Sequence, residues 1–287
     1  QISSCTGNII VDDNTIENAE TGGIFVYKNE SVSEDVPTHI EITNNKIKNY
    51  ATAPVEGSGY KETYLREAAS AIAVSYNLRE GVQPVVSITG NTTSNGAEGK
   101  PVLAFGGGTT DASAIPTDLS RITVSGNVFD NPYIKYIKTS GELDISDNTW
   151  VGVRVYNETT KKEYDTIQGA IDEADLGKNI IKVFPGDYDE TDPIEIVQRE
   201  GVNITLEAVG DVVLKNQILI YGSTRSDGDE TLTIKGFTFD LAGANDNIDI
   251  ISAPDILPDN NYSYAHNIKI ENNTFIGNPE VDVVAIK

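Results

Sequence analysis

A short recurring phrase constrains the fold of this chain more than any other feature. Each copy is eight residues long and begins with a β-branched residue. Its fourth residue is Asn, its sixth is usually apolar, and its eighth is Asn or Gly. The copies begin at Val11, Ile42, Ile88, Val124, Ile145 and Ile270, and share Asn14, Asn45, Asn91, Asn127, Asn148 and Asn273. The phrase holds while the intervals between copies vary. That pattern is typical of a solenoid whose insertions fall in loops.

The phrase predicts two short strands joined at a corner. In the second copy, Ile42 and Ile47 stand on either side of Asn45 and point inward if the strands alternate. Asn suits the corner because it tolerates the left-handed backbone region and bonds to neighbouring backbone groups. When coils stack, we expect the corner asparagines to lie above one another as an amide ladder.

A second, more apolar strand type follows most phrases. These runs are Gly23–Tyr27, Ala71–Ser75, Val102–Phe105 and Tyr133–Ile137. Their composition favours strands buried on both faces of a parallel stack. The alternative is an antiparallel sandwich with Asn-Gly turns, but only Asn95-Gly96 offers that dipeptide. A sandwich also leaves the repeated phrase unexplained, so we favour the coil.

These phrases resemble those of right-handed parallel β-helix proteins, the pectin-lyase-like group, over nearly the whole chain. The resemblance implies an all-β fold, a right-handed parallel β-helix solenoid. It implies little about chemistry, because that group mixes lyases, hydrolases, esterases, phage spikes and adhesins.

The segment from Val153 to Glu190 breaks the pattern. Ile167, Ala170, Ile171 and Ala174 have helical spacing, which predicts a helix over Asp165–Gly177 with Asp165 and Gln168 as a variant capping box. A strand and the turn Pro185–Glu190 follow. This set resembles the opening cap of a β-helix, as in pectin methylesterases. We therefore expect residues 1–152 to be the later coils of one β-helix, and residues 153–287 to be the cap helix and first coils of a second.

Both ends of the sequence read as repeat material. Gln1–Cys5 leads directly into the first phrase, and Val283–Ile286 reads as a strand. We expect the chain to be a fragment of a longer protein, or else a complete subunit whose open coil ends stack on neighbours.

The net charge of the chain limits which binding partners and which cellular location we expect. Forty-four acidic and 21 basic residues give a net charge of −23, spread over the sequence. Nucleic acid is disfavoured as a partner because a basic footprint is lacking. No apolar run is long enough for a membrane span. The composition favours an extracellular or cell-surface protein.

No catalytic set is recognisable in the sequence, so we assign no catalytic residue. The characteristic motif sets of the pectin hydrolases, pectate lyases and methylesterases are absent. His39 and His266 have no Cys/His cluster around them and read as ordinary surface or corner residues. Asp12, Asp13, Asp130, Asp144 and Asp147 stand near phrase corners, where carboxylates from successive coils could form an acid–base pair that hydrolyses glycosides. We favour the simpler interpretation that they are exposed, solubilising residues.

Two groups of residues are candidates for binding. Tyr50, Tyr60, Tyr64 and Tyr76 lie in or around the long segment Ala51–Ala69 and are predicted to form a sugar platform; equally, that segment could fold over the coil with its tyrosines packed down. Asp227, Asp229 and Glu230 belong to an acidic stretch whose oxygens suit calcium, although a solvated turn is the simpler interpretation. No other cofactor is expected.

The leading hypothesis is a non-catalytic β-helical module of a secreted or cell-surface protein, acting as a stalk, an adhesin or a glycan-contact surface. One alternative is a carbohydrate-active lyase or hydrolase, suggested by the resemblance and by groove geometry alone. Another is a filament or spike subunit that self-associates through its open coil ends.

Overall fold

The chain forms two compact units, Gln1–Gly152 and Val153–Lys287, which we call unit 1 and unit 2. The computed structural model describes residues 2–3, 7–29, 38–52, 69–78, 82–107, 114–190, 192–223, 228–244, 247–254 and 264–287. None of the helices in these ranges is long and apolar enough to cross a membrane.

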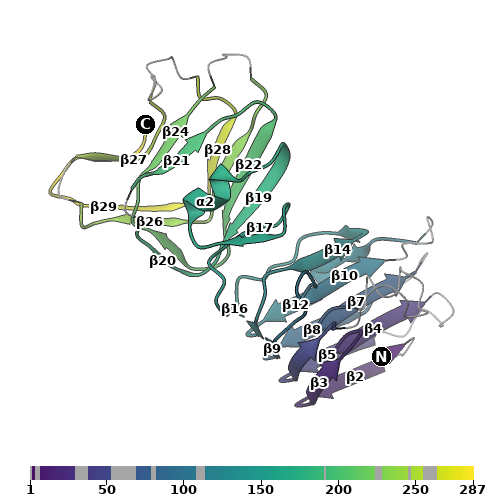
Figure 1. Ribbon diagram of the computed structural model, residues 1–287. Helices are drawn as coiled ribbons and strands as arrows, with labels where there is room; N and C mark the ends of the chain where they lie inside the picture. Colours follow the sequence, from purple (N-terminus) through teal and green to yellow (C-terminus); the bar gives the residue numbers. More distant parts are fainter. Residues whose placement is uncertain are drawn as a thin grey trace. The chain divides into compact units, whose positions relative to one another are not determined.

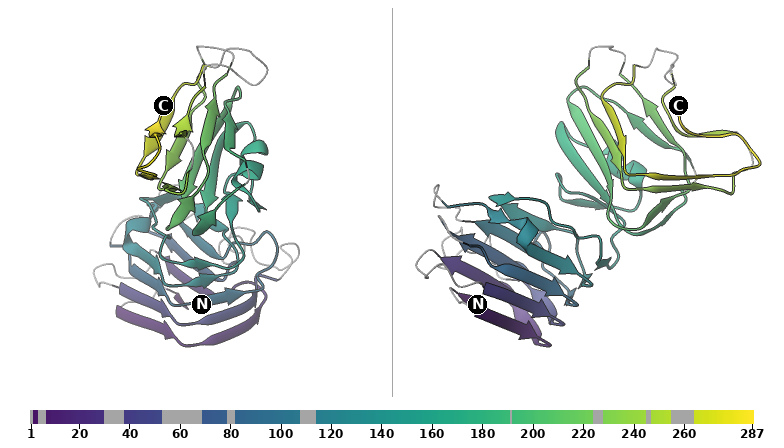
Figure 2. Two further views of the ribbon diagram at one scale, coloured as in Figure 1. Left: turned by 90° about the vertical axis from the view of Figure 1, so that its left-hand side faces the viewer. Right: turned by 180° about the vertical axis from the view of Figure 1, so that it is seen from behind.

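Unit 1 is a parallel β-solenoid built from three main sheets (Figures 1 and 2). The first contains β1 (Ile2–Ser3), β4 (Ile24–Asn29), β7 (Ile72–Asn77), β10 (Leu103–Gly107) and β14 (Ile134–Ile137). The second contains β2 (Gly7–Asp12), β5 (Thr38–Thr43), β8 (Val85–Thr89) and β12 (Ile122–Ser125). The third contains β3 (Thr15–Ala19), β6 (Lys46–Tyr50), β9 (Thr92–Ser94), β13 (Val128–Phe129) and β16 (Thr149–Trp150). A small parallel pair, β11 (Thr117–Asp118) and β15 (Thr139–Ser140), and the 3-10 turn η1 (Leu119–Arg121) complete it.

The phrases stack in register, one per coil. Ile42 pairs with Val11 on one side and with Ile88 on the other, and Ile88 pairs with Val124. In the third sheet, Phe129 pairs with Trp150, and their rings lie 5.0 Å apart. These side chains are buried in the middle coils and half-buried in the first, where Val11 has a coil on one side only. The prediction of a parallel coil with these residues inward is confirmed.

The expected amide ladder runs through the corner asparagines of unit 1. The Nδ2 groups of Asn14, Asn45, Asn91 and Asn127 donate to the Oδ1 atom of the next ladder asparagine at 2.8–2.9 Å, ending at Asn148. Each Oδ1 also accepts from the backbone N–H of the preceding ladder asparagine. Asn14 is exposed, but Asn45, Asn91, Asn127 and Asn148 are buried, so their amides must find hydrogen-bond partners inside the protein, and the ladder supplies them.

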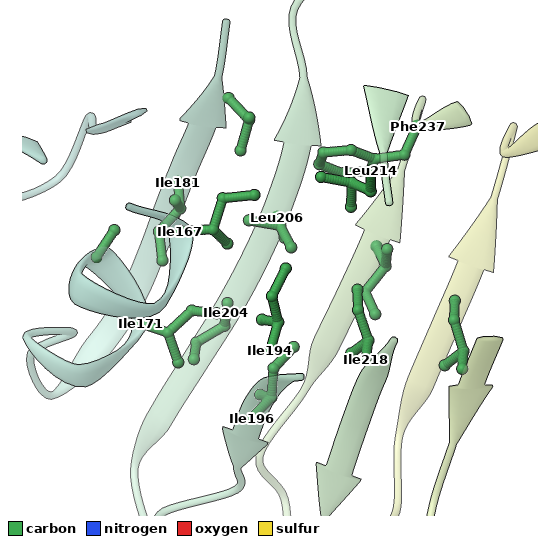
Figure 3. Packing of buried hydrophobic residues seen from close by; sticks show 14 of the residues in the cluster. Ile167, Ile171, Ile181, Ile194, Ile196, Ile204, Leu206, Leu214, Ile218 and Phe237 are labelled. Atoms are coloured by element: carbon green, nitrogen blue, oxygen red, sulfur yellow. The ribbon is translucent and has the colours of Figure 1, made fainter. Parts of the chain in front are cut away.

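Unit 2 is a second solenoid with three stacks of four parallel strands, the first of which two antiparallel strands extend to a six-stranded sheet (Figure 1). One contains β19 (Gly177–Val183), β22 (Val202–Ala208), β25 (Leu232–Lys235) and β28 (Ile268–Glu271). The next contains β20 (Gly186–Tyr188), β23 (Val212–Leu214), β26 (Thr238–Leu241) and β29 (Thr274–Gly277). The last contains β21 (Ile194–Val197), β24 (Ile218–Tyr221), β27 (Ile248–Ser252) and β30 (Val283–Ile286). One strand from each stack makes one coil, and the inward residues form a continuous apolar core (Figure 3).

An alternating row of charges fixes the register on the outer face of the first stack in unit 2. Lys182 pairs with Glu207, Glu207 with Lys235, and Lys235 with Glu271. The Lys235 ammonium lies 3.1 Å from the Glu207 carboxylate. Like charges directly opposite each other are unfavourable in a sheet, so this row disfavours the registers that would align equal signs.

The cap helix is shorter than the sequence predicted. Helix α2 spans Ile167–Asp172, and its N-cap is Thr166, whose hydroxyl accepts from the Gly169 N–H at 3.0 Å. The expected cap residue Asp165 is displaced because the Thr166 side chain is the one in position to accept. Gly177 does not end the helix but begins β19, with φ of +94°. Ile167, Ala170, Ile171 and Ala174 are buried as expected.

The first coil of unit 2 is closed by three different groups, whereas the sequence suggested that the helix alone covers its strand edges. The hairpin of β17 (Val155–Asn157) and β18 (Lys162–Tyr164) pairs antiparallel with the edge of β19. The Gln168 side-chain amide donates to the Glu195 carbonyl at 3.0 Å and accepts from its N–H at 2.7 Å, as a neighbouring strand would. The apolar face of α2 covers the interior, where Ile167 and Ile171 lie among Ile181, Ile194 and Ile204 (Figure 3). The hairpin thus pairs the edge of β19, Gln168 pairs the edge at Glu195, and the helix covers the apolar interior between them.

Candidate functional site

An open groove on unit 2 crosses three successive coils. It has a volume of about 540 Å³ and is lined by Asp189, Lys215, Asp240, Leu241, Ala242, Gly243, Ala244, Asn247 and Ile248. Asp189 follows β20, Lys215 follows β23, and Asp240 lies in β26. These three strands are neighbours in one stack, which brings residues far apart in the sequence to one wall of the groove.

The charges of this groove are centred on Lys215. Its ammonium lies 2.9 Å from the Asp187 carboxylate. The pKa of Lys215 is raised above its ordinary value, first by the hydrogen bond and charge of Asp187 and then by the charges of Asp189 and Asp240. The lysine therefore stays protonated; it is paired with Asp187, and the charges of Asp189 and Asp240 also act on it. The groove offers hydrogen-bond acceptors in excess and carries net negative charge.

One part of the groove lining is a turn of small residues held by a side-chain carboxylate and a side-chain amide. Asp240 Oδ1 accepts from the Ala242 N–H at 3.1 Å, and Asn278 Nδ2 donates to the Ala244 carbonyl at 2.7 Å. Ala242 and Gly243 are exposed, while Leu241 is buried beneath them. Small exposed residues leave room for a ligand against the backbone.

The predicted sugar platform looks different in the structure. Tyr50 and Tyr76 have 0% and 1% of their surface exposed. Tyr60 and Tyr64 lie outside the described residues. The Tyr50 and Tyr76 side chains therefore belong to the interior of unit 1, which agrees with the packed-down alternative for these two residues.

Tyr50 takes part in a polar network that joins three coils. Its hydroxyl donates to Asp130 Oδ1 at 2.8 Å and accepts from Asn131 Nδ2 at 2.8 Å. The Thr93 hydroxyl and the Gly96 N–H also donate to the Asp130 carboxylate. A Cβ at Gly96 would lie 2.3 Å from the Tyr50 ring, so only glycine leaves space for the ring there. The half-buried Asp130 carboxylate therefore has a structural role, with both of its oxygens accepting hydrogen bonds.

Replacing Tyr50 by Phe is expected to lower the free energy of unfolding of unit 1 by about 2 kcal/mol, because the Asp130 carboxylate loses one of its donors while the ring is kept. Trp150, the sole tryptophan, lies in unit 1, so urea unfolding followed by its fluorescence measures this change. An unchanged midpoint would show that the phenol hydroxyl contributes nothing to the network.

The corner carboxylates considered as acids serve as hydrogen-bond acceptors. Asp12 Oδ1 accepts from Thr43 and Asn44, and these bonds hold the pKa of Asp12 below its ordinary value. Asp144 accepts from the side chain and the backbone of Ser146, which lowers the pKa of Asp144. Both groups are therefore kept ionised, the opposite of what a general acid requires.

The acidic stretch proposed for calcium is partly occupied by an ion pair. Glu230 is buried and its Oε2 lies 2.8 Å from His266 Nε2, while Asp229 is exposed and Asp227 lies outside the described residues. In the described ranges, no three His, Cys, Asp or Glu side chains come close enough together to hold a metal ion. We assign no residue to a metal.

Sequence reasoning missed the partner of His266 although a signal for it exists. Ile234 and Ile270 are paired in β25 and β28. Counting back four residues from each gives Glu230 and His266, which therefore occupy equivalent positions on neighbouring coils. The groove residues had no comparable signal, because Asp189 and Lys215 stand outside any repeated phrase.

Comparison of the chain with family models, with curated proteins and with solved structures found no match.

Proposed function

We propose that this protein is a non-catalytic β-solenoid module of a secreted or cell-surface protein that contacts a glycan through the groove of unit 2. The pectin-lyase-like resemblance of the phrases and the strongly acidic composition support this placement. The observation that carries the proposal is the groove itself, in which Asp189, Lys215 and Asp240 from three coils face one open volume.

The chemistry of the groove suits a neutral sugar chain. Carboxylate oxygens accept charge-assisted hydrogen bonds from sugar hydroxyls, and the Lys215 ammonium can donate to a ring or hydroxyl oxygen. Stacked coils place such groups along one direction, and a polysaccharide likewise repeats its sugar units along one direction. Uronates fit poorly, because the carboxylates near Lys215 outnumber the single cation.

Several features favour contact without turnover. Asp240 already uses one oxygen to hold the turn, and Lys215 is paired with Asp187. Asp189 and Lys215 are exposed at the rim of an open groove. Enzymes of this type need an acid, a base and a charge-stabilising group preorganised in a site that excludes water.

Binding to immobilised neutral polysaccharides and to polygalacturonate tests this function. We expect binding to a neutral polymer, weakened about tenfold or more by the double change Asp189→Asn with Asp240→Asn, which corresponds to the loss of one or two charge-assisted bonds. Asn at position 240 keeps the oxygen that accepts from Ala242, so the turn is preserved.

The matched control is Lys269→Gln, compared with Lys215→Gln. Lys269 is also paired to a carboxylate of unit 2, at 2.7 Å, but lies outside the groove. We expect only Lys215→Gln to weaken binding. Preferred binding to polygalacturonate, or release of new reducing ends or unsaturated products that one Asp→Asn change abolishes, would contradict the proposal.

A further inference from the structure

The Glu230–His266 pair occupies a corner where three connections of unit 2 meet. Glu230 precedes β25, His266 precedes β28, and Gln198 follows β21. The Gln198 side-chain amide donates to the His266 carbonyl at 2.7 Å and accepts from the His266 N–H at 3.0 Å. One histidine is thus held both through its backbone and through its ring.

Both ring nitrogens of His266 face hydrogen-bond acceptors. Nδ1 lies 2.8 Å from the Tyr264 carbonyl oxygen, which can only accept. Nε2 lies 2.8 Å from Glu230 Oε2, which can only accept when the carboxylate is ionised. A neutral imidazole carries one N–H and satisfies one of these contacts, leaving lone pairs facing each other at the other. The geometry fits the doubly protonated ring.

The corner is also built for close approach. A Cβ at Gly228 would lie 2.2 Å from Glu230 Oε2 and 2.3 Å from His266 Nε2, so the pair exists only because this residue is glycine. The Glu230 side chain is 4% exposed and that of His266 15%. An ion pair this sheltered depends strongly on both charges.

We propose that Glu230 and His266 form a proton-dependent latch, which joins the connections before β25 and β28 while His266 is charged and opens when the ring loses its proton. With both ring nitrogens used, His266 has no lone pair left for catalysis or for a metal. The latch is a conformational device of unit 2 and does not depend on the groove.

The electrostatic surroundings agree with this latch. The pKa of His266 is raised above its ordinary value, first by the hydrogen bond to Glu230, then by the Tyr264 carbonyl and the charges of Glu230 and Asp229. The pKa of Glu230 is lowered, first by the hydrogen bond from His266. Gln198, the third group at the corner, is uncharged.

The sign of the pH dependence follows from these directions. A raised His266 pKa gives stabilisation that is complete below 6.5, the ordinary value, and is lost as the pH rises through the folded-state value. A lowered Glu230 pKa gives stabilisation that is present above 4.5 and is lost as the pH falls through its folded-state value. The latch is therefore fully closed between these two ordinary values and opens on the alkaline side.

Hydrogen exchange at pH 5.5 and pH 9 tests the latch, with protection corrected for the intrinsic rate. We expect the amides of Tyr264 and His266 to lose protection at least tenfold at pH 9, while those of β19 and β22 keep theirs. The Tyr264 N–H donates to the Ser223 carbonyl and the His266 N–H donates to the Gln198 side chain, so both bonds depend on the position of the segment that carries His266.

The variant Glu230→Gln separates protonation from other alkaline effects. Its amide can donate to a neutral His266 Nε2 while Nδ1–H donates to Tyr264, so we expect its protection to be the same at both pH values. Equal protection of wild type at the two pH values, or equal losses in wild type and Glu230→Gln, would overturn the proposal.

Proton NMR titration of the two histidine rings gives a readout that does not depend on a variant folding. The variant His39→Gln removes one of the two signals and so assigns both. We expect the pKa of His266 to lie above 6.5, the ordinary value of histidine. A His266 pKa at or below that ordinary value would refute the latch.

Discussion

Replacing Asn91 by Asp is expected to lower the free energy of unfolding of unit 1 by about 4 kcal/mol. Asn91 Nδ2 donates to the carbonyls of Ile42 and Thr89 and to Asn127 Oδ1, and the side chain is fully buried. Aspartate has the same shape but places an oxygen where those three acceptors converge. The change therefore buries a charge and turns one carboxylate oxygen toward three acceptors, while the other oxygen keeps the donors from Asn45. It also interrupts the ladder in its middle.

Asn95→Asp is the matched control for this prediction. Asn95 donates to Asn49 in a second, exposed asparagine row and has φ of +54°, a conformation that Asp also tolerates. We expect a loss below about 0.5 kcal/mol, as for an exposed polar contact. Urea unfolding followed by Trp150 fluorescence measures both variants. Similar losses for the two substitutions would show that the buried ladder does not hold the coils.

The second large effect is expected from Ile171→Asp in the cap of unit 2. Ile171 is 3% exposed and packs with Ile181, Ile194 and Ile204 beneath α2 (Figure 3). A carboxylate on this side chain costs about 4 kcal/mol, because it would lie among the apolar side chains beneath the helix. The helix should detach and expose the first coil, which promotes aggregation.

Leu176→Asp tests whether the effect comes from the helix face. Leu176 lies five residues further on and is 80% exposed, so we expect this change to leave unit 2 intact. Hydrogen exchange of β19 and β22 reports on unit 2, and Trp150 fluorescence should show unit 1 unchanged in both variants. A stable, fully protected unit 2 in Ile171→Asp would contradict the role given to the cap helix.

The fold was predictable because the repeated phrase places the same residue types at the same positions of successive coils. Ile42, Asn45 and Ile47 each have a position that recurs in the next coil, and the structure pairs them in the expected register. The exact ends of the cap helix were not predictable in the same way. Thr166 and Asp165 are both good N-cap residues, and in the structure the Thr166 hydroxyl is the one that accepts from the Gly169 N–H.

The candidate site was harder to predict because its residues meet only through stacking. Asp189, Lys215 and Asp240 belong to different coils, and their proximity depends on turn lengths that vary from coil to coil. Tyr50 illustrates the opposite difficulty. Its position beside a long segment left an exposed ring and a packed-down ring equally open. The space left by Gly96 and the acceptor on Asp130 place the ring inside.

The central claim is that the groove of unit 2 is the glycan-contact surface. The most direct test is an NMR titration of the isotope-labelled chain. A neutral oligosaccharide, taken from a polysaccharide that the chain binds, is added stepwise, and the backbone amide shifts are followed. The proposal predicts saturable shifts at Lys215, Ala242, Gly243, Ala244 and Asn247, with the residues around Tyr50 unchanged. Shifts confined to unit 1, or a groove that stays unperturbed at saturation, would contradict it.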